Sequence, residues 1–431
     1  MRSISLIPPK APPSLLMIVV IASLIMFISL GLRQCLGLFL QPVTADLGVS
    51  AAGFGLAFAL HNLTWGLSQP FVGALADRWG TRPVVAICGL IYAAGLALMA
   101  GSRHAFVGLD LGMGLLTGLG IAGTGFGVLL GAVSRAARPE RRSQVLGLVS
   151  GLGSAGVLVL APLGQRLIDH WDWRLAAATY AIVVLATVPL ALFLGRPGVA
   201  PVDNPTDARG GVATAAREAL SHGGFVAMTV AFFACGLQLM FITVHLPRFL
   251  SLCGMPPALG ATALGIIGLC NAIGSYVFGL LGARYSRRKL LATIYVCRTL
   301  AIITYISLPV TEASTLLFSA VMGFTWLGVL PLVSGLIGRM FGLRDFSMLF
   351  GLVFFCHQLG GFLGSWLGGL ILDSTGSYQP AWYALVGVGI IATVLQWPMN
   401  DRPVPRMLTC HLRSERGHAH GTGALRRCHS P

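Results

Sequence analysis

Residues 73–83 read GALADRWGTRP, and residues 279–289 read GLLGARYSRRK, so one short polar pattern occurs twice in the chain. Each copy joins two apolar segments that are long enough to be membrane helices. A polar connection repeated at the same place in a series of apolar segments indicates that the chain consists of two similar halves.

The two copies differ at one charged position. The aligned pairs are Gly73 with Gly279, Leu75 with Leu281, Arg78 with Arg284, Trp79 with Tyr285 and Arg82 with Arg288. Asp77, however, has Ala283 opposite it, so only the first copy carries a carboxylate. Two repeated membrane bundles with a site between them are typical of transporters that work by alternating access.

The composition is that of an integral membrane protein. The chain has 431 residues, of which 55% are hydrophobic and 10% charged, with a mean hydropathy of +0.80. A soluble domain could not keep so much apolar surface away from water. The expected membrane spans are 15–41, 52–73, 84–101, 105–133, 144–168, 174–195, 224–250, 257–281, 289–309, 313–338, 347–372 and 378–398.

These spans predict an all-α integral membrane fold of twelve transmembrane helices in two pseudo-symmetric six-helix halves. The expected parts are a cytoplasmic amino terminus 1–14, a first half 15–195, a linker 196–223, a second half 224–398 and a basic tail 399–431. The linker is rich in Pro, Gly and charge, which is typical of a connection between domains.

Most of the 29 Lys and Arg lie in segments on one side of the expected spans, together with both termini. The positive-inside rule therefore predicts that both termini are cytoplasmic. Topology and contact with the lipid bilayer account for the net charge of +15, so no nucleic-acid partner is expected.

Glycine makes up 56 of the 431 residues, and several glycines of two spans are four positions apart. Gly360, Gly364 and Gly368 are an example from the eleventh span. Small residues at this spacing allow close helix packing, either as static faces or as contacts that slide. Their concentration in two spans favours sliding contacts.

Arg33 is the sharpest single feature, because a guanidinium inside a membrane helix needs a partner or a wet cavity. Its forked donors suit a carboxylate, which makes Arg33 a candidate binding residue for an organic anion. The alternative is a structural role, with the side chain reaching the outer headgroups or backbone carbonyls.

Other polar residues lie well inside the expected spans and are further candidates for substrate binding. They are Asn271, His357, His61, Asn62, Thr124 and Gln238. The alternative for each is a hydrogen bond between two helices. Arg298, also deep in a span, is expected to be structural because its helix should lie at the periphery of the bundle.

The same inventory limits how a proton could be carried. Of the 14 carboxylates only Asp110 lies inside a span, near its outer end. A coupled proton would therefore be carried by His357, by His61 or by the carboxylate of the substrate, and His357 is favoured because imidazole titrates near pH 6.5.

The loop 73–83 resembles the signature loop of the major facilitator superfamily, through residues expected to form a cytoplasmic gate. These residues are Gly73, Asp77, Arg78, Gly80 and Arg82. The stretches 31–43, 61–80, 245–250, 268–275 and 357–378 are similar to the bacterial branch of monocarboxylate porters. The resemblance implies that spans one, four, seven and ten line a central cavity, where Asn271 and His357 look like residues that hold substrate in related lactate carriers.

The sequence also departs from this branch. The eighth span has Asn271 where related carriers often have an Arg, and Gly156 is not adjacent to Pro162 as in drug antiporters. We therefore expect a proton-coupled secondary transporter of a small organic anion, a monocarboxylate, over a drug efflux transporter or a transporter-like sensor. We expect a monomer that is not an enzyme, with a small-molecule substrate and protons as partners and no cofactor or metal.

Overall fold

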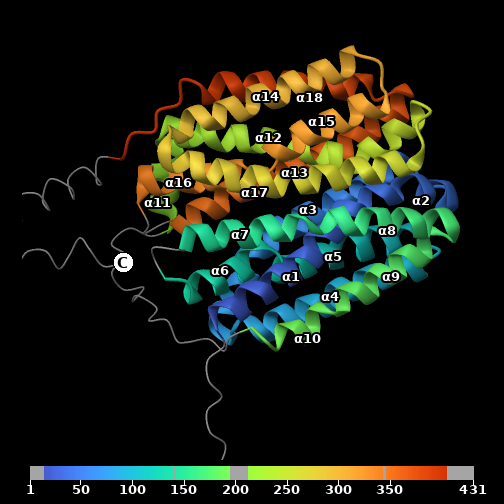
Figure 1. Cartoon of the computed structure of the whole chain (residues 1–431), viewed down its shortest axis with the longest axis horizontal. Helices are drawn as coiled ribbons and strands as arrows, with labels where there is room; N and C mark the ends of the chain where they lie inside the picture. Colours follow the sequence, from blue (N-terminus) through green and yellow to red (C-terminus); the bar gives the residue numbers. More distant parts are fainter. Residues whose placement is uncertain (1–13, 139–141, 195–211, 343–345, 405–431) are drawn as a thin grey trace, which may run out of the picture.

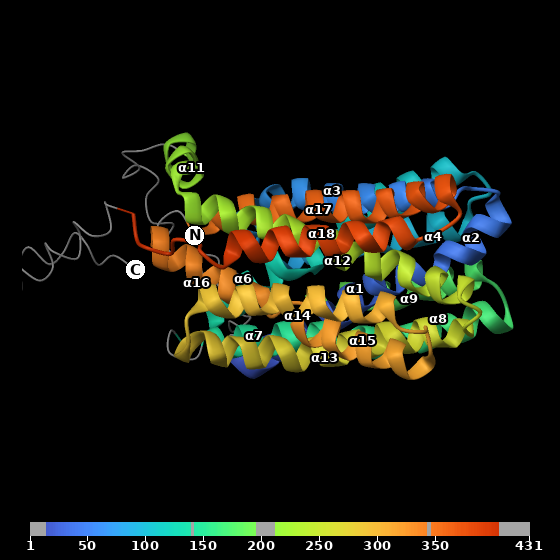
Figure 2. The same cartoon turned by 90° about the horizontal axis from the view of Figure 1, so that it is seen from above.

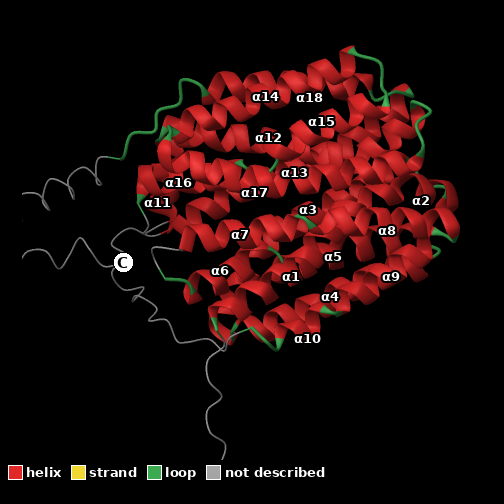
Figure 3. Cartoon of the chain, in the orientation of Figure 1, coloured by secondary structure: helices red, strands yellow, loops and turns green. Residues whose placement is uncertain are grey.

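The computed structural model describes residues 14–138, 142–194, 212–342 and 346–404, without the side chains of Asp77, 142–144, 212–215 and 346–348. Within these ranges every regular element is a helix (Figure 3). The predicted all-α membrane fold is therefore confirmed. The predicted amino terminus and basic tail lie almost entirely outside the described residues.

The amino-terminal half contains the first six expected spans, several of which consist of two or three helical pieces. Its elements are α1 (Leu15–Cys35), η1 (Leu36–Phe39), α2 (Leu40–Leu47), α3 (Ala51–Trp79), α4 (Thr81–Gly101), η2 (Phe106–Leu116), α5 (Thr117–Thr124), α6 (Phe126–Ala136), α7 (Arg142–Ser154), α8 (Gly156–His170), α9 (Trp173–Leu185) and α10 (Thr187–Ala191). The segment η2 is wound as a π-helix.

The carboxy-terminal half repeats this plan. Its elements are α12 (Gly223–Leu252), α13 (Pro257–Arg284), α14 (Arg287–Ser307), α15 (Glu312–Thr325), α16 (Val329–Phe341), α17 (Phe346–Thr375) and α18 (Gln379–Gln396). A further helix, α11 (Val212–Ser221), lies inside the expected linker 196–223.

Eleven helical segments among the described residues are long and apolar enough to cross a membrane. The remaining expected span, 52–73, corresponds to α3, which has 29 residues and a length of about 43 Å. Polar residues, including His61, Asn62 and Gln69, lower the hydropathy of α3. The helix that least resembles a membrane span in composition is thus the one that carries polar groups into the bundle.

The two halves lie side by side as separate bundles, blue to green below and yellow to red above (Figure 1). They meet where α3 packs on α17 and where α7 and α8 pack on α13. Both ends of the described chain lie at the same end of the bundle (Figure 2). We call this the terminal end, and the opposite end, at α2, the distal end.

The internal repeat extends to equivalent hydrogen bonds in the two halves. Arg82 donates to the carbonyl oxygen of Leu194, which follows the last helix of the first half. Its aligned partner Arg288 donates to the carbonyl oxygen of Met399, at 2.7 Å, which follows the last helix of the second half. Each arginine therefore ties the second helical hairpin of its half to the end of that half.

Glycine allows the closest helix crossings inside each half. A Cβ at Gly156 would collide with the carbonyl of Phe27 in α1, and one at Gly360 would collide with that of Phe233 in α12. Gly364 approaches Leu237 of α12 in the same way. These contacts join helices of one half, whereas Gly55 and Gly369 come equally close to Ser365 and Ala51 of the opposite half. The sliding contacts therefore stay a prediction.

Candidate functional site

A narrow cavity of about 40 Å³ lies between the two halves, near the middle of the bundle. Both halves contribute to its lining: Leu30, Arg33, Gln34, Trp65, Phe126, Ser154, Phe232, Leu239, Met240, Trp326, Leu327, Leu330, Phe354, His357 and Gln358. We call this space the central cavity. Arg33 and His357, predicted from the sequence as binding residues, both line it.

Arg33 is buried near the end of α1, and its guanidinium connects the two halves. Nη2 donates to Oδ1 of Asn62 in α3 at 2.6 Å and contacts Sδ of Met240 in α12 at 2.8 Å. The guanidinium lies over the ring of Trp65, 4.9 Å from its centroid. Nε has no hydrogen-bond partner among the described atoms, so this cation retains a free donor.

Asn62 is oriented by two bonds from its own amide nitrogen. Nδ2 donates to the carbonyl oxygen of Phe58 at 3.1 Å and to Oγ of Ser365 in α17 at 3.4 Å. These bonds assign Oδ1 to face Arg33, because the nitrogen must point to the two acceptors. Asn62 therefore holds the guanidinium with a neutral oxygen, and the positive charge is not cancelled.

His357 lies on the opposite side of the central cavity, in α17. Its Nδ1 is 3.1 Å from Oε1 of Gln358, whose Nε2 donates to the carbonyl oxygen of Asn62 at 3.3 Å. The imidazole packs on Phe232, with ring centroids 4.6 Å apart. Nε2 has no hydrogen-bond partner among the described residues and is the group that His357 offers to the cavity.

Three other predicted binding residues are placed elsewhere. His61 points from α3 to Oγ1 of Thr117, at 2.7 Å, on the side away from Asn62. Thr124 donates to the carbonyl oxygen of Gly120 at the end of α5. Gln238 donates to the carbonyl oxygen of Leu385 in α18. Their role in binding stays a prediction, to which this geometry adds no support.

Asn271 and Arg298 hold the break between α15 and α16. Oδ1 of Asn271 accepts from the backbone N–H of Leu327 at 2.9 Å. Arg298 donates to the carbonyl oxygens of Thr325 and, at 2.6 Å, of Trp326. Since Trp326 and Leu327 line the central cavity, Asn271 and Arg298 position part of its wall from behind.

A polar cluster on the distal side of the cavity was not predicted. His245 in α12 approaches the carbonyl oxygen of Ser365 through Nε2 at 2.7 Å, and the hydroxyl of Tyr378 through Nδ1 at 2.9 Å. Because the carbonyl oxygen of Ser365 can only accept, Nε2 carries the proton of a neutral imidazole, and the Tyr378 hydroxyl donates to Nδ1. Ser365 then links this cluster to Asn62.

Sequence spacing could have identified some of the missed lining residues. Residues three apart on a helix share a face. Trp65 follows Asn62 by three positions, and Phe354 precedes His357 by three, and both line the central cavity. Met240 offered no such signal, because it is one of many apolar residues of α12.

The predicted cytoplasmic gate lies at the terminal end, between α3 and α4. Gly80 has a φ of +94°, a conformation that favours glycine and allows α4 to begin directly after α3. Arg78 is exposed, and a Cβ at Gly73 would meet no atom within 4 Å. The side chain of Asp77 lies outside the described residues, so its role as a gate stays a prediction.

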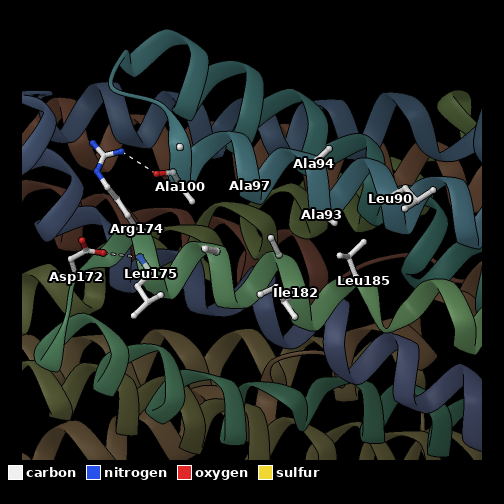
Figure 4. Close-up of a pocket in the computed structure, with 13 residues that line it drawn as sticks. Leu90, Ala93, Ala94, Ala97, Ala100, Asp172, Arg174, Leu175, Ile182 and Leu185 are labelled. Atoms are coloured by element: carbon white, nitrogen blue, oxygen red, sulfur yellow. Dashed lines mark hydrogen bonds between the residues drawn. The ribbon is translucent and has the colours of Figure 1, made fainter.

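A larger groove of about 730 Å³ lies between α4 and α9, on the outside of the first half (Figure 4). Its lining is almost wholly aliphatic, for example Leu90, Ala97 and Ile182, with Asp172 and Arg174 at one end. Arg174 is already paired with Asp46 at 2.9 Å. This apolar face is suited to lipid chains, whereas the central cavity has convergent polar groups.

Charge distinguishes the central cavity. Arg33 lines it, but no Asp or Glu does so among the described residues. Nor does the described part of the chain contain a group of three His, Cys, Asp or Glu that could hold a metal ion. The cavity thus presents a buried cation, a histidine and apolar walls.

A family model described as Major Facilitator Superfamily matches residues 22–331 and 268–409 of the chain. Monocarboxylate transporter 11 of Homo sapiens is 30% identical over 364 residues, covering 81% of this chain and 75% of that protein. Monocarboxylate transporter 13 of Rattus norvegicus is 29% identical over 376 residues, covering 84% and 85% respectively.

A bacterial relative and a solved structure extend these similarities. An uncharacterized transporter of the major facilitator type from Bacillus subtilis (strain 168) is 25% identical over 386 residues, covering 86% of this chain and 91% of that protein. The crystal structure of a D-xylose-proton symporter superposes with a TM-score of 0.69 at 14% identity, covering 90% of this chain and 99% of that one. At this identity the symporter supports the fold alone.

Proposed function

The chain belongs to the Major Facilitator Superfamily, and from this premise we propose that it carries a small monocarboxylate, with a proton, by alternating access. Its relatives are multi-pass membrane transporters and not enzymes. The proposal concerns the substrate, the coupling ion and the mode of movement. Two of the relatives are named monocarboxylate transporters, which is consistent with the substrate class.

The observation that carries the proposal is the buried guanidinium of Arg33 in the central cavity. It is neutralised by no carboxylate of the cavity lining, and its Nε has no partner among the described atoms. A buried charge is costly unless it is paired. A carboxylate from the substrate would supply the missing charge and accept hydrogen bonds from the guanidinium.

His357 is the proposed proton carrier, because it is the titratable side chain besides Arg33 in the described lining of the cavity. A substrate anion at Arg33 would lie close enough to stabilise a protonated imidazole, and departure of the anion would favour release of the proton. Binding of anion and proton would thus support each other, as a symporter requires.

For alternating access, we propose that the two halves rock about the central cavity and expose it to one side at a time. The halves meet in two contact regions, α3 with α17 and α7 and α8 with α13, about which such a motion could take place. The distribution of Lys and Arg supports a bacterial inner membrane with the terminal end facing the cytoplasm.

The test is uptake into proteoliposomes that contain the full chain. Labelled lactate, pyruvate, oxalate and longer carboxylates would be offered with and without an imposed pH gradient. We expect accumulation of a monocarboxylate when the outside is acidic. If no anion accumulates or exchanges, the proposed substrate class is wrong, whereas the fold would be unaffected.

Arg33→Gln tests directly whether the buried guanidinium of Arg33 binds the substrate. We expect uptake to fall at least tenfold, because a hydrogen bond to a charged group is worth about 1.5–3 kcal/mol. Arg166→Gln is the matched control, because Arg166 is an exposed residue of α8 and should not affect uptake. Normal uptake by a correctly inserted Arg33→Gln protein would remove Arg33 from the site.

A further inference from the structure

Aromatic side chains cover much of the central cavity, beside Arg33. Five of them line it and come from both halves: Trp65, Phe126, Phe232, Trp326 and Phe354. We call these five residues the aromatic wall. Trp65 lies directly under the guanidinium of Arg33, so a carboxylate bound at Arg33 would have this wall next to it.

Four of the five residues of the aromatic wall belong to a series of ring contacts that crosses the interface of the two halves and includes His357. The rings of Phe126 and Trp65 have centroids 6.5 Å apart, and those of Trp65 and Phe354 are 5.4 Å apart. Phe354 stacks on His357 at 6.2 Å, and His357 packs on Phe232 at 4.6 Å. A ligand in the cavity therefore meets ring faces and edges from one half to the other.

The remaining polar groups of the lining are mostly engaged with the protein itself. Gln34 and Ser154 donate to backbone carbonyls of their own helices. Gln358 bonds Asn62 and His357. Among the described residues, the lining thus offers a ligand the guanidinium of Arg33 and Nε2 of His357, and little else that is polar.

We propose that the substrate is a monocarboxylate with an aromatic side group, whose carboxylate binds Arg33 and whose ring packs on the aromatic wall once the halves have moved apart, since the cavity of about 40 Å³ is too small to hold such an acid. This inference rests on the proposed function and narrows its substrate class. Ring pairs prefer the offset and edge-to-face arrangements that the wall can offer to a further ring. A polyhydroxylated acid would leave hydroxyl groups unpaired against Phe232 and Trp65, and each unpaired group would weaken binding about tenfold or more.

The experiment compares acids that differ only in a phenyl ring. Proteoliposomes with the full chain would take up labelled phenyllactate or lactate, and phenylpyruvate or pyruvate, with gluconate as the polyhydroxylated acid. We expect each phenyl compound to have a KM at least about fivefold lower than its partner, and gluconate to be the poorest substrate.

Two outcomes overturn the inference and are distinguishable from each other. Uptake of lactate and pyruvate with KM values equal to or below those of the phenyl compounds overturns the aromatic side group and leaves the proposed function intact. It would mean that the aromatic wall only seals the space between the halves. Absence of uptake and exchange for all five acids overturns the proposed function, and this inference with it.

Phe232→Leu gives a second measurement that does not depend on absolute activity. Phe232 lies in the aromatic wall and packs on His357, whereas the rings nearest the guanidinium of Arg33 are Phe58 and Trp65. The variant should therefore lower the preference for phenyllactate over lactate, the ratio of their KM values, toward one. Phe318→Leu is the matched control. Phe318 is equally buried but packs on Tyr305 and Trp382 in the second half, and its variant should keep the preference. An unchanged preference in Phe232→Leu would contradict the proposal.

Discussion

Asn62 holds the guanidinium of Arg33 with an oxygen that carries no charge, 2.6 Å from Nη2. This choice of residue matters if the guanidinium must accept an anion from outside. An aspartate at the same place would have nearly the same shape and would neutralise Arg33 permanently. The site would then contain its own counter-ion and would have little reason to bind another.

Asn62→Asp is therefore expected to raise the KM for the transported anion by at least tenfold. Asn62→Ala is the matched variant, because it removes the same hydrogen bond without adding a charge. It should leave the guanidinium free to bind the anion and should affect KM much less. Initial uptake rates in proteoliposomes measure both values. Equal KM values in the two variants would contradict the view that Arg33 acts as the unpaired cation.

His357→Gln removes the proposed proton carrier and keeps a side chain that can form hydrogen bonds. Substrate exchange between the two sides of a proteoliposome needs no net proton movement, so it should persist at a reduced rate. Accumulation driven by a pH gradient should be lost, since glutamine does not titrate. The measurement is labelled uptake with and without the gradient. Full accumulation in this variant would mean that the proton is carried elsewhere.

Sequence predicts that a polar residue lies in a membrane span more readily than it predicts where that residue points. His61 and Asn62 are neighbours, yet neighbours on a helix diverge by about 100°, so Asn62 faces Arg33 while His61 faces Thr117. Gln238 turns to α18 instead of the cavity. Without the packing of the helices, no feature of these residues distinguishes the two directions.

At the scale of elements, the break between α15 and α16 is held by a buried cation. Arg298 donates to the carbonyl oxygens of Thr325 and Trp326, which lack intrahelical donors at the end of α15. Arg298 was predicted to be structural, and its contacts show what that role is. It supplies hydrogen-bond donors to the end of α15, whose next residues line the central cavity. A cation at a helix C-terminus is also favoured by the helix dipole.

Arg298→Met is expected to destabilise the protein clearly. It leaves two buried carbonyl groups without donors, each at a cost of about 1–3 kcal/mol. Arg339→Met is the control, because Arg339 is half-exposed and its pair with Asp401 should contribute about 0–1 kcal/mol. Thermal unfolding in detergent should show a much lower Tm for the first variant only. Equal Tm values would mean that water replaces the lost donors.

The spans themselves were predictable because each needs a long apolar stretch, and their observed ends differ from the expected ones by a few residues. The places where a span is interrupted were not predictable from the sequence. Helical geometry is interrupted at Gly125, between α5 and α6, and at Gly328, between α15 and α16, although glycine also occurs inside unbroken helices such as α13. Partners from distant helices, such as Arg298, decide which glycine ends a helix.

At the scale of the whole molecule, the repeated loop indicated two halves, and the matching bonds of Arg82 and Arg288 now give that repeat a physical meaning. The difference at Asp77 led us to expect the closing contact of the halves at the terminal end. That contact stays a prediction, because the side chain of Asp77 lies outside the described residues. Among the described residues, a hydrogen-bonded contact between the halves lies at the distal end. There the carboxylate of Asp373, at the end of α17, accepts from the backbone N–H groups of Ala51 and Ala52 at 3.1 and 2.7 Å.

Asp373 thus caps the first turn of α3 from the other half, and we call this contact the distal latch. Other close approaches between the halves lie nearby: a Cβ at Gly369 would collide with Ala51, and one at Gly37 with the carbonyl of Thr243. An anionic cap at a helix N-terminus is worth about 0.3–1 kcal/mol when exposed, as Asp373 is. Rocking of the halves would have to break the latch whenever the distal end opens.

Asp373→Asn should therefore shift the protein toward states that are open at the distal end, by about two- to fivefold in population. Spin labels at His170→Cys and Gln379→Cys, one exposed position in each half, would report the distance in a background with Cys253→Ser, Cys410→Ser and Cys428→Ser. Asp46→Asn is the matched control, because Asp46 pairs with Arg174 inside one half and its loss should leave the distance distribution unchanged. The same distribution in Asp373→Asn as in the parent protein would show that packing at Gly37 and Gly369 closes the distal end without the latch.

A weaker effect of Asp373→Asn at high salt would follow from screening of this exposed carboxylate.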